Sequence, residues 1–417
     1  MKSSIRATAI LAGLALTSLG LVACASGDAT PSSSNADNGE CLNPLAATLP
    51  ADPDGAIASL PTGVQGNYSN YPSIVSASPY ADFVSPKTDG FVIGYSNSFS
   101  GNAWRAAALQ TLEENVAAYK ELGIVSDLIV TDSNGDNTVQ IQQMRSLIQQ
   151  GVDLILAIPG SPDALNGAID EAYAAGIPVI TVASPVTTDK AINVDVNGYL
   201  VGAIQAFGLV NLLEGSGNIM TVQGIPGTSG SAQIEAGGNA IFERCPNIDI
   251  VADFAGEWSE SVAKTGMLQA LSTNPQQLDG VWQQGSMFMG IIQALEQQGR
   301  PQIPVTDGNP NQNALAYWRD NLANGFDSAG TANSPNGDMD VAFRVGIRTL
   351  LGQGAKIASI VINPPTITSE NLSEWLEPSY NIEPTGIGVP PAGTWMPDAT
   401  LDGFFNDPAE LPATPWQ

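Results

Sequence analysis

The chain has 417 residues, of which 43% are hydrophobic and 13% are charged, and its formal net charge is -27. Because this length exceeds the usual single-core size of about 250–300 residues, we predict a body of two lobes. So acidic a surface repels phosphate backbones, which excludes nucleic-acid binding. The sequence contains no histidine, which excludes Ser-His-Asp and Cys-His nucleophiles and histidine zinc sites.

The first 23 residues are predicted to be an export signal. Lys2 and Arg6 precede an apolar run, which ends in the sequence LVAC at residues 21–24 and is followed directly by a polar segment. This arrangement favours a cleaved signal over a membrane span. The LVAC sequence resembles the bacterial lipobox, which implies that Cys24 receives lipid and anchors the exported protein to the outer face of the cell membrane. An ordinary signal peptide with a chance cysteine is the alternative.

Residues 24–41 are rich in Ser, Gly, Asn, Asp and Ala. Such a composition cannot bury enough apolar surface to fold, so we predict a flexible tether. Two cysteines remain besides Cys24, namely Cys41 and Cys245. An even number of cysteines in an exported protein favours a disulfide between them. Two free thiols are the alternative, because the sequence does not give the distance between the two residues.

Residues 42–90 lack sustained periodicity and are expected to form an irregular N-terminal extension packed on the body. From residue 91 onward, short apolar runs alternate with amphipathic ones, which is typical of βαβ units and parallel sheets. The predicted strands lie at 91–95, 128–130, 154–158, 179–182, 192–196, 219–222, 250–254, 281–282, 303–305 and 357–362. The predicted helices lie at 103–122, 139–150, 162–175, 198–213, 231–244, 259–272, 287–298, 312–324 and 339–351. Residues 369–417 are rich in Pro and Gly and are expected to wrap the surface as a tail.

The stretch 91–110 contains the first candidate site. A buried strand, a polar loop and a helix follow one another there, and the first helical turn carries Asn102, Trp104 and Arg105. In an open parallel sheet, ligands lie beyond the carboxyl ends of the strands, where helix N-termini offer unpaired N–H groups and a partial positive charge. An indole adds a stacking face and a guanidinium adds a fork of donors. This corner is therefore predicted to face a ligand; a core or rim position for Trp104 and a solvated position for Arg105 are the alternatives.

Two other segments show incomplete motifs. Residues 132–138 have the oxygen spacing of a calcium loop, but Asn137 stands where the loop needs glycine and Gln143 where it needs glutamate. Residues 224–230 are rich in glycine but lack the lysine that would reach a phosphate. We therefore predict neither a metal site nor a cofactor.

A series of landmarks occurs in a fixed order along the chain. They are Asn102 with Trp104, Gln140 with Met144, GVD at 151–153, GIPV at 176–179, VDVNG at 194–198 and GIPGTS at 224–229. In this order they resemble the type I periplasmic binding proteins of the ribose and galactose group, which are the substrate-binding lipoproteins of sugar-importing ABC transporters. The resemblance covers roughly two thirds of the chain, from residue 91 to about 374.

The resemblance implies an α/β fold of two doubly wound parallel-sheet lobes joined by a three-crossover hinge, with the ligand in the cleft between the lobes. It implies that residues 91–195 and 334–362 form lobe 1, and that residues 196–333 and 363–368 form lobe 2. The crossovers would lie near Asp195, Asn333 and Ile362.

The resemblance also implies roles for individual residues. The Asn and the aromatic residue of the first helical turn contact the sugar in the family, which points to Asn102 and Trp104, with Arg105 one position further. Trp258 would close on the opposite face of the sugar ring. The remaining implied ligand-binding residues are Gln284, Asp307 and Asn333.

This sequence departs from the family pattern at three places. Ile158 stands where sugar binders often carry an Asn before a Pro, and Ala183-Ser184 stand where they often carry Asp-Arg. The arginine expected in the helix after residues 227–229 is also missing.

The predicted function is that of an extracellular, lipid-anchored substrate-binding protein of an ABC importer, and not that of an enzyme. Its predicted partners are a small polar ligand, first of all a sugar, the ABC permease, and the membrane through lipid on Cys24. One alternative is a ligand sensor for a signalling receptor. The other is an exported glycoside hydrolase that uses carboxylates such as Glu257 and Asp307.

Overall fold

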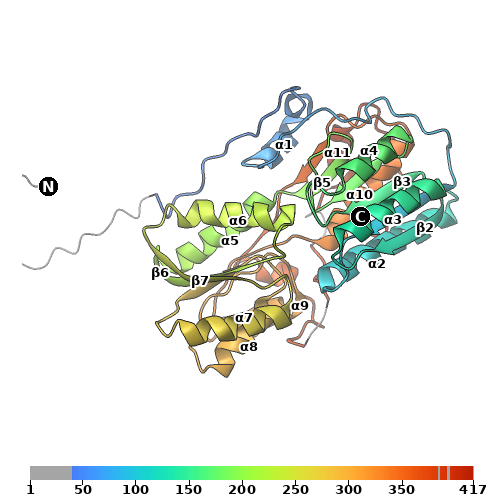
Figure 1. Cartoon of the computed structure of the whole chain (residues 1–417). Helices are drawn as coiled ribbons and strands as arrows, with labels where there is room; N and C mark the ends of the chain where they lie inside the picture. The colour runs from blue at the N-terminus through green and yellow to red at the C-terminus, as the bar shows by residue number, and fades with distance from the viewer. Residues whose placement is uncertain (1–39, 384–385, 392–394, 417) are drawn as a thin grey trace, which may run out of the picture. The chain divides into compact units, whose positions relative to one another are not determined.

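The computed structural model describes residues 40–383, 386–391 and 395–416. Its larger sheet has six strands in the order β10-β5-β4-β3-β1-β2, and every neighbouring pair is parallel. These strands are β1 (Phe91–Asn97), β2 (Val125–Asp132), β3 (Leu154–Ile158), β4 (Val179–Val182), β5 (Ile192–Val196) and β10 (Ser359–Ile362). Strands β2, β3 and β5 of this sheet are labelled in Figure 1. The four strands β3, β4, β5 and β10 are buried along their whole length, as expected where helices cover both faces of a parallel sheet.

Two pairs of helices cover this sheet. Helices α2 (Ala103–Glu121) and α10 (Pro335–Leu350) share one hydrophobic core with the alternate strand residues Leu154, Leu156 and Ile158. Helices α3 (Asn137–Gln150) and α4 (Asn166–Ala174) share a second core with the intervening residues of β3. Because side chains alternate across a strand, the two cores lie on opposite faces of the sheet.

The second sheet has three parallel strands in the order β7-β6-β8. They are β6 (Ser216–Gln223), β7 (Asn247–Ala255) and β8 (Gly280–Gln283). Helices α5 (Gly198–Leu212) and α6 (Ser229–Phe242) share one core with it, and helices α7 (Glu260–Thr273), α8 (Phe288–Gln297) and α9 (Gln312–Leu322) share another. Glycines let α5 and α6 touch: a Cβ on Gly202 would lie 1.8 Å from the carbonyl oxygen of Ile234.

The chain passes three times between elements of the two sheets. Strand β5 of the larger sheet runs directly into α5, and the short strand β9 (Gly330–Thr331) runs into α10. Strand β10 then leads to β11 (Thr366–Ile367), which pairs antiparallel with β9. All described residues belong to one compact unit.

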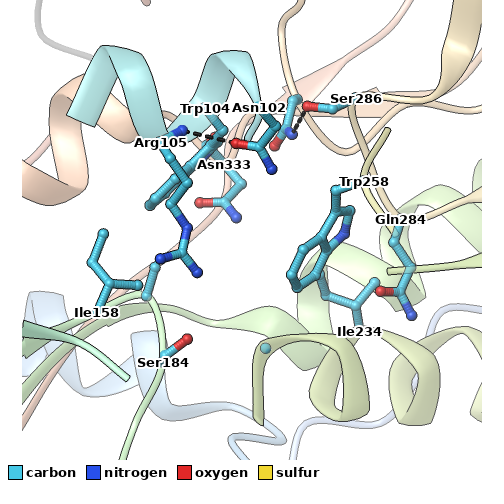
Figure 2. A pocket seen from close by; sticks show the side chains of 13 residues that line it. Asn102, Trp104, Arg105, Ile158, Ser184, Ile234, Trp258, Gln284, Ser286 and Asn333 are labelled. Atoms are coloured by element: carbon cyan, nitrogen blue, oxygen red, sulfur yellow. Dashed lines mark hydrogen bonds between the residues drawn. The ribbon is translucent and has the colours of Figure 1, made fainter. Parts of the chain in front are cut away.

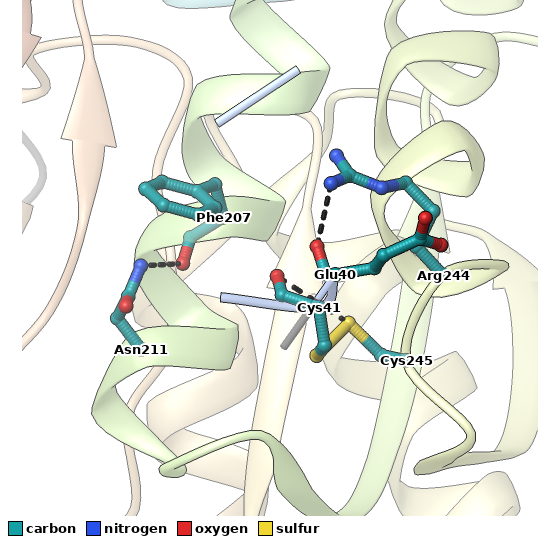
Figure 3. The surroundings of a disulfide bond; sticks show 6 residues. All are labelled: Glu40, Cys41, Phe207, Asn211, Arg244 and Cys245. Atoms are coloured by element: carbon teal, nitrogen blue, oxygen red, sulfur yellow. Dashed lines mark hydrogen bonds between the residues drawn. A yellow bond between two sulfur atoms is a disulfide. The ribbon is translucent and has the colours of Figure 1, made fainter. Parts of the chain in front are cut away.

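The extension before β1 contains three short helical segments, η1 (Ile57–Ser59), α1 (Thr62–Gln65) and η2 (Gly66–Tyr68). Its side chains join the core of the larger sheet, where the hydroxyl of Tyr68 donates to the carbonyl oxygen of Ser359 at 2.6 Å. The start of the extension is joined to the end of α6 by a disulfide between Cys41 and Cys245 (Figure 3).

The tail after β11 contains η3 (Leu372–Trp375), α11 (Asp398–Leu401) and η4 (Asp402–Phe404). It binds α10 through two buried arginines of that helix. Arg344 donates to the carboxylate of Asp398 at 2.9 Å, and Arg348 forms an ion pair with Asp402 at 2.7 Å.

One predicted strand is wrong, and the helices predicted to begin at Pro162 and Met339 begin four residues later and four residues earlier. The strand predicted at 303–305 is only a single parallel bridge between Val281 and Val305, because Pro304 has no N–H to continue a ladder. The helix predicted to begin at Pro162 begins four residues later, at Asn166. Ser161 accepts from the backbone N–H of Ala164 at 3.3 Å, so it organises a turn before the helix.

The signal predicted over residues 1–23, the lipid site at Cys24 and the tether up to residue 39 lie outside the described residues. Within the part of the chain that the structure describes, none of the helices is long and apolar enough to cross a membrane.

Candidate functional site

A cavity lies where the carboxyl ends of β3, β4 and β8 meet the first turn of α2. It encloses about 510 Å³ of space free of protein atoms, part of which is open to solvent. It is lined by Asn102, Trp104, Arg105, Ile158, Ala183, Ser184, Gly230, Ile234, Trp258, Gln284, Ser286, Asn309 and Asn333 (Figure 2). Six of the seven predicted ligand-binding residues therefore line one cavity, although they come from segments up to 231 residues apart in the sequence.

The N-terminal cap of α2 positions the first group of these residues. Asn102 has an extended backbone, and its side-chain oxygen accepts from the backbone N–H of Arg105 at 2.9 Å. Trp104, in the first turn, donates its indole N–H to the carbonyl oxygen of Asn333 at 3.0 Å. The cap thus fixes the first turn of α2, and the indole of Trp104 is held against Asn333, two residues before α10.

Arg105 is a buried cation whose contacts are to neutral groups. It is 6% exposed, and its Nη1 donates to Asn97 at 2.8 Å and to Ser98 at 3.1 Å. Burial lowers the pKa of Arg105, while electrostatic interactions with Tyr95 and Asp132 act in the opposite direction. Asp132 contacts Arg105 only through Asn97, which donates to its carboxylate at 2.8 Å.

Trp258 faces this group from the other side of the cavity, as Figure 2 shows. Trp258 and the preceding Glu257 both have a left-handed backbone, with φ values of 52° and 56°. Such a conformation is strained for residues other than glycine, and strained residues concentrate at functional sites. The indole packs directly over Gly224, where an added Cβ would lie 2.2 Å from the ring atom Cε2.

Three lining residues, Gln284, Ser286 and Asn309, already have hydrogen-bond partners within the protein. The side-chain oxygen of Gln284 accepts from the backbone N–H of Gly224 and from the hydroxyl of Ser231, both at 2.9 Å, and its nitrogen donates to the carbonyl oxygen of Ser231 at 3.1 Å. Ser286 and Asn309 are hydrogen-bonded to each other at 2.7 Å. Gln284 therefore holds the wall of the cavity and has little hydrogen-bonding capacity left for a ligand.

Asp307 lies behind the cavity and does not line it. It is 8% exposed, and its Oδ1 accepts from the backbone N–H groups of Ser286 at 3.3 Å and Asn309 at 3.1 Å. Burial raises the pKa of Asp307 to about 7. Its contacts make it a brace for two lining residues, so it acts on the cavity through them.

Several lining residues were not among the predicted site residues. Ile158, Ala183 and Ser184 were noted as departures from a family pattern, whereas Ser286, Asn309 and Ile234 were not singled out. Ala183 and Ser286 have left-handed backbones with φ values of 52° and 58°, so both end their strands with sharp turns into the cavity. Their position just after an apolar strand was the signal in the sequence; for Ile234, in the middle of α6, the sequence offered none.

The carboxylates proposed for a hydrolase are absent from this cavity. Neither Glu257 nor Asp307 is among the described residues that line it. The described residues also contain no cluster of three or more Cys, Asp or Glu side chains that could hold a metal ion.

The chain matches the periplasmic binding protein domain over residues 93–353, which is more than half of its length, and it belongs to this family. It is 30% identical to the xylitol-binding protein of Mycolicibacterium smegmatis over 254 residues, which are 60% of this chain and 71% of that protein. It is 25% identical to the ribose import binding protein of Bacillus subtilis over 231 residues, which are 55% of this chain and 73% of that protein.

Solved structures agree with this membership. An ABC transporter solute binding protein from Thermobispora bispora matches with a TM-score of 0.64 at 26% identity, covering 70% of this chain and 90% of that one. A solute binding protein from Bacillus halodurans with bound myo-inositol shares the fold with a TM-score of 0.63 at 22% identity, covering 70% and 99%. The predicted resemblance to type I periplasmic binding proteins and the predicted parallel-sheet α/β fold are confirmed. Because the relatives are binding proteins, the prediction that the chain is not an enzyme is also confirmed.

Proposed function

We propose that this protein is the exported, lipid-anchored receptor of an ABC importer and captures a small hydroxylated solute, a sugar or polyol, in the cavity. One observation supports this proposal most strongly. The first turn of α2, Trp258 and Gln284 line the same cavity, which lies at the strand ends of two parallel sheets. The ligands after which two relatives are named, xylitol and ribose, support this class of solute.

In this proposal the two sheets belong to two lobes that close on the ligand. Lobe 1 comprises 91–195 and 334–362, lobe 2 comprises 196–333 and 363–368, and the three connecting segments form the hinge. Closure removes the ligand from water, so hydrogen bonds and aromatic contacts act in a less polar environment. Separation of the lobes at the permease would release the ligand.

The proposed clamp consists of Trp104 and Trp258 on opposite faces of the solute. The indole N–H of Trp104 is already bonded to Asn333, which leaves its ring face as the group available to the ligand. A sugar ring has apolar C–H faces and hydroxyls at its edge, so stacked indoles and edge-on polar groups fit it. In this proposal the polar groups of Arg105, Asn102 and Asn333 bind the hydroxyls at the edge of the sugar ring.

The test of solute binding is a thermal-shift screen over monosaccharides and polyols, followed by calorimetry and mass spectrometry of the recovered ligand. A solute at 100 times its dissociation constant stabilises the folded protein by about 2.7 kcal/mol. Saturable binding with recovery of the intact solute is expected. Recovery of a cleaved product would favour the hydrolase, and absence of binding across the panel would reject the proposal.

The anchor and the importer are tested separately. Cys24→Ala should release the protein into the medium or leave its precursor unprocessed, and unchanged membrane fractionation would reject lipidation. Genes for a permease and an ATPase beside this one would favour the importer over the sensor. Transport of the solute by vesicles that contain this permease should require the binding protein.

A further inference from the structure

The open polar groups of the cavity are mostly hydrogen-bond donors. Arg105 uses Nη1 for Asn97 and Ser98, and its Nε and Nη2 have no partner among the described residues. Asn102 uses its oxygen as the helix cap, which leaves its amide nitrogen open. Among the described lining side chains, the acceptors without a hydrogen-bond partner are the hydroxyl of Ser184 and Oδ1 of Asn333, which is buried. The hydroxyl of Ser286 and the side-chain oxygen of Asn102 each have one partner.

The cavity also carries a positive charge without a facing negative charge. Arg105 is the sole ionisable side chain among the described residues that line it. The wall near Ser184 is completed by Ile158 and Ile234, whose side chains offer no acceptor. Helices α2 and α6 both begin at the cavity, since Asn102 and Gly230 line it, and helix N-termini carry a partial positive charge. Figure 2 shows the guanidinium of Arg105 reaching into the space opposite Trp258.

The open edge of Arg105 is the edge that binds carboxylates. Nε and Nη2 form a fork with two parallel N–H directions. The same two atoms of Arg145, on the surface of this protein, hold the carboxylate of Glu171 at 2.9 and 2.7 Å. Arg145 uses this fork to hold a carboxylate. In Arg105 the same fork is buried, faces the cavity and is not occupied by any protein group that the structure describes.

From this geometry we infer that the ligand is a hydroxylated acid, with a carboxylate that binds the Nε–Nη2 edge of Arg105. The inference rests on the proposed function and narrows the solute from sugars in general to sugar acids. A carboxylate only accepts hydrogen bonds, so it matches a donor-rich cavity, and its charge compensates a buried guanidinium. A hydroxyl of a neutral sugar in the same place would bring a donor as well as an acceptor and no charge, so it matches the Nε–Nη2 edge of Arg105 less well.

The rest of the ligand fits the rest of the cavity. The amide groups of Asn102 and Asn333 can take a hydroxyl next to the carboxylate, and the indole of Trp258 covers the carbon skeleton. A single arginine fork suits the single charge of a carboxylate, whereas a phosphate ester carries nearly two charges and would need more cations.

The experiment measures binding to the wild-type protein by calorimetry with matched neutral and acidic solutes. The pairs are ribose with ribonate, xylose with xylonate, galactose with galactonate, and glucose with glucuronate, and xylitol and ribose 5-phosphate are added. In at least one pair, the acid is expected to bind at least tenfold more tightly than its neutral partner. The methyl ester of that acid, which keeps the shape and removes the charge, is expected to lose at least tenfold.

Variants of Arg105 then test whether this residue binds the carboxylate. Arg105→Gln is expected to reduce the preference for the acid at least tenfold, and Arg105→Lys, which keeps the charge but not the fork, is expected to lie between it and the wild type. Arg145→Gln is the matched control, because it removes the same fork from an exposed ion pair that does not line the cavity. It is expected to leave the preference unchanged. Thermal unfolding of each variant shows whether it is folded, and the ester comparison stands without any variant.

The outcomes separate this inference from the proposed function. If neutral sugars bind as tightly as their acids, or more tightly, the inference is wrong and the proposed function stands. The same holds if the methyl ester binds as well as the acid, or if ribose 5-phosphate exceeds every acid. If no solute of either series binds, the proposed function and the inference fall together.

Discussion

Trp258 offers the sharpest test of how the cavity is built, because its indole and its backbone make separate contributions. Trp258→Ala and Trp258→Gly both remove the indole that covers one side of the cavity. Loss of a buried aromatic contact at the centre of a binding site costs on the order of 2–4 kcal/mol, which corresponds to roughly 30- to 800-fold in affinity. Calorimetry with the best-binding solute should therefore show a similar loss for both variants.

The two Trp258 variants should differ in stability. With φ of 52°, the backbone at this position is strained for alanine but not for glycine. The glycine variant should therefore be the more stable of the two, by about 1 kcal/mol in urea denaturation. Equal affinity of the folded alanine variant and the wild type would refute the clamp, and a less stable glycine variant would refute the argument from strain.

Three further predictions concern stability and the cavity edge. Cys41→Ser with Cys245→Ser opens a disulfide that joins residues 204 apart, and the loss in urea denaturation should be about 2–5 kcal/mol. Asp307 has a pKa of about 7 when folded against 3.8 as its ordinary value, so its contribution is fully present below pH 4 and is lost as the pH rises through 7. Relative to the wild type, Asp307→Asn should become more stabilising over this window, by at most roughly 4 kcal/mol, as measured by denaturation at pH 4.5 and pH 8. Asn102→Ser keeps a capping oxygen for α2 but removes the open amide, so the unfolding midpoint should stay within about 2 °C while affinity falls roughly tenfold; an unchanged affinity would remove Asn102 from the ligand contacts.

The strands of the larger sheet could be predicted from the sequence because they are short apolar runs bounded by turn residues. Strands β3, β4 and β5 lie at the predicted residues without a shift. The strand predicted at 303–305 is wrong because the apolar pattern there competes with Pro304, which cannot donate to a neighbour. A local hydrophobic pattern therefore predicts a strand correctly where the backbone can form the hydrogen bonds of that strand, and fails where a proline prevents them.

The site was predictable in part for the same reason. Asn102, Trp104 and Arg105 follow a strand and a loop directly, so their place at the cavity depends on local sequence alone. Asp307 also follows an apolar segment, yet it points behind the cavity, because it accepts hydrogen bonds from the backbone of the neighbouring turn at Ser286. Which of two turns faces the ligand depends on contacts between distant segments, and these are not visible in the sequence.

The segments outside the family match add contacts at the place where the chain leaves the larger sheet. The side-chain amide of Asn197, directly after β5, donates to the carbonyl oxygens of Asn67 at 3.0 Å and Ser69 at 2.9 Å, both in the extension. The same extension bonds to β10 through Tyr68, and its first residues are linked to the end of α6 by the disulfide at Cys41. A motion that separates the two sheets must therefore either break hydrogen bonds at β5 and β10 or be absorbed in the residues between Cys41 and Ala56, because Ala56 and Ile57 already pack in the core of the larger sheet. The disulfide fixes one end of that segment and this packing fixes the other, so its length limits how far the sheets can separate without breaking these contacts.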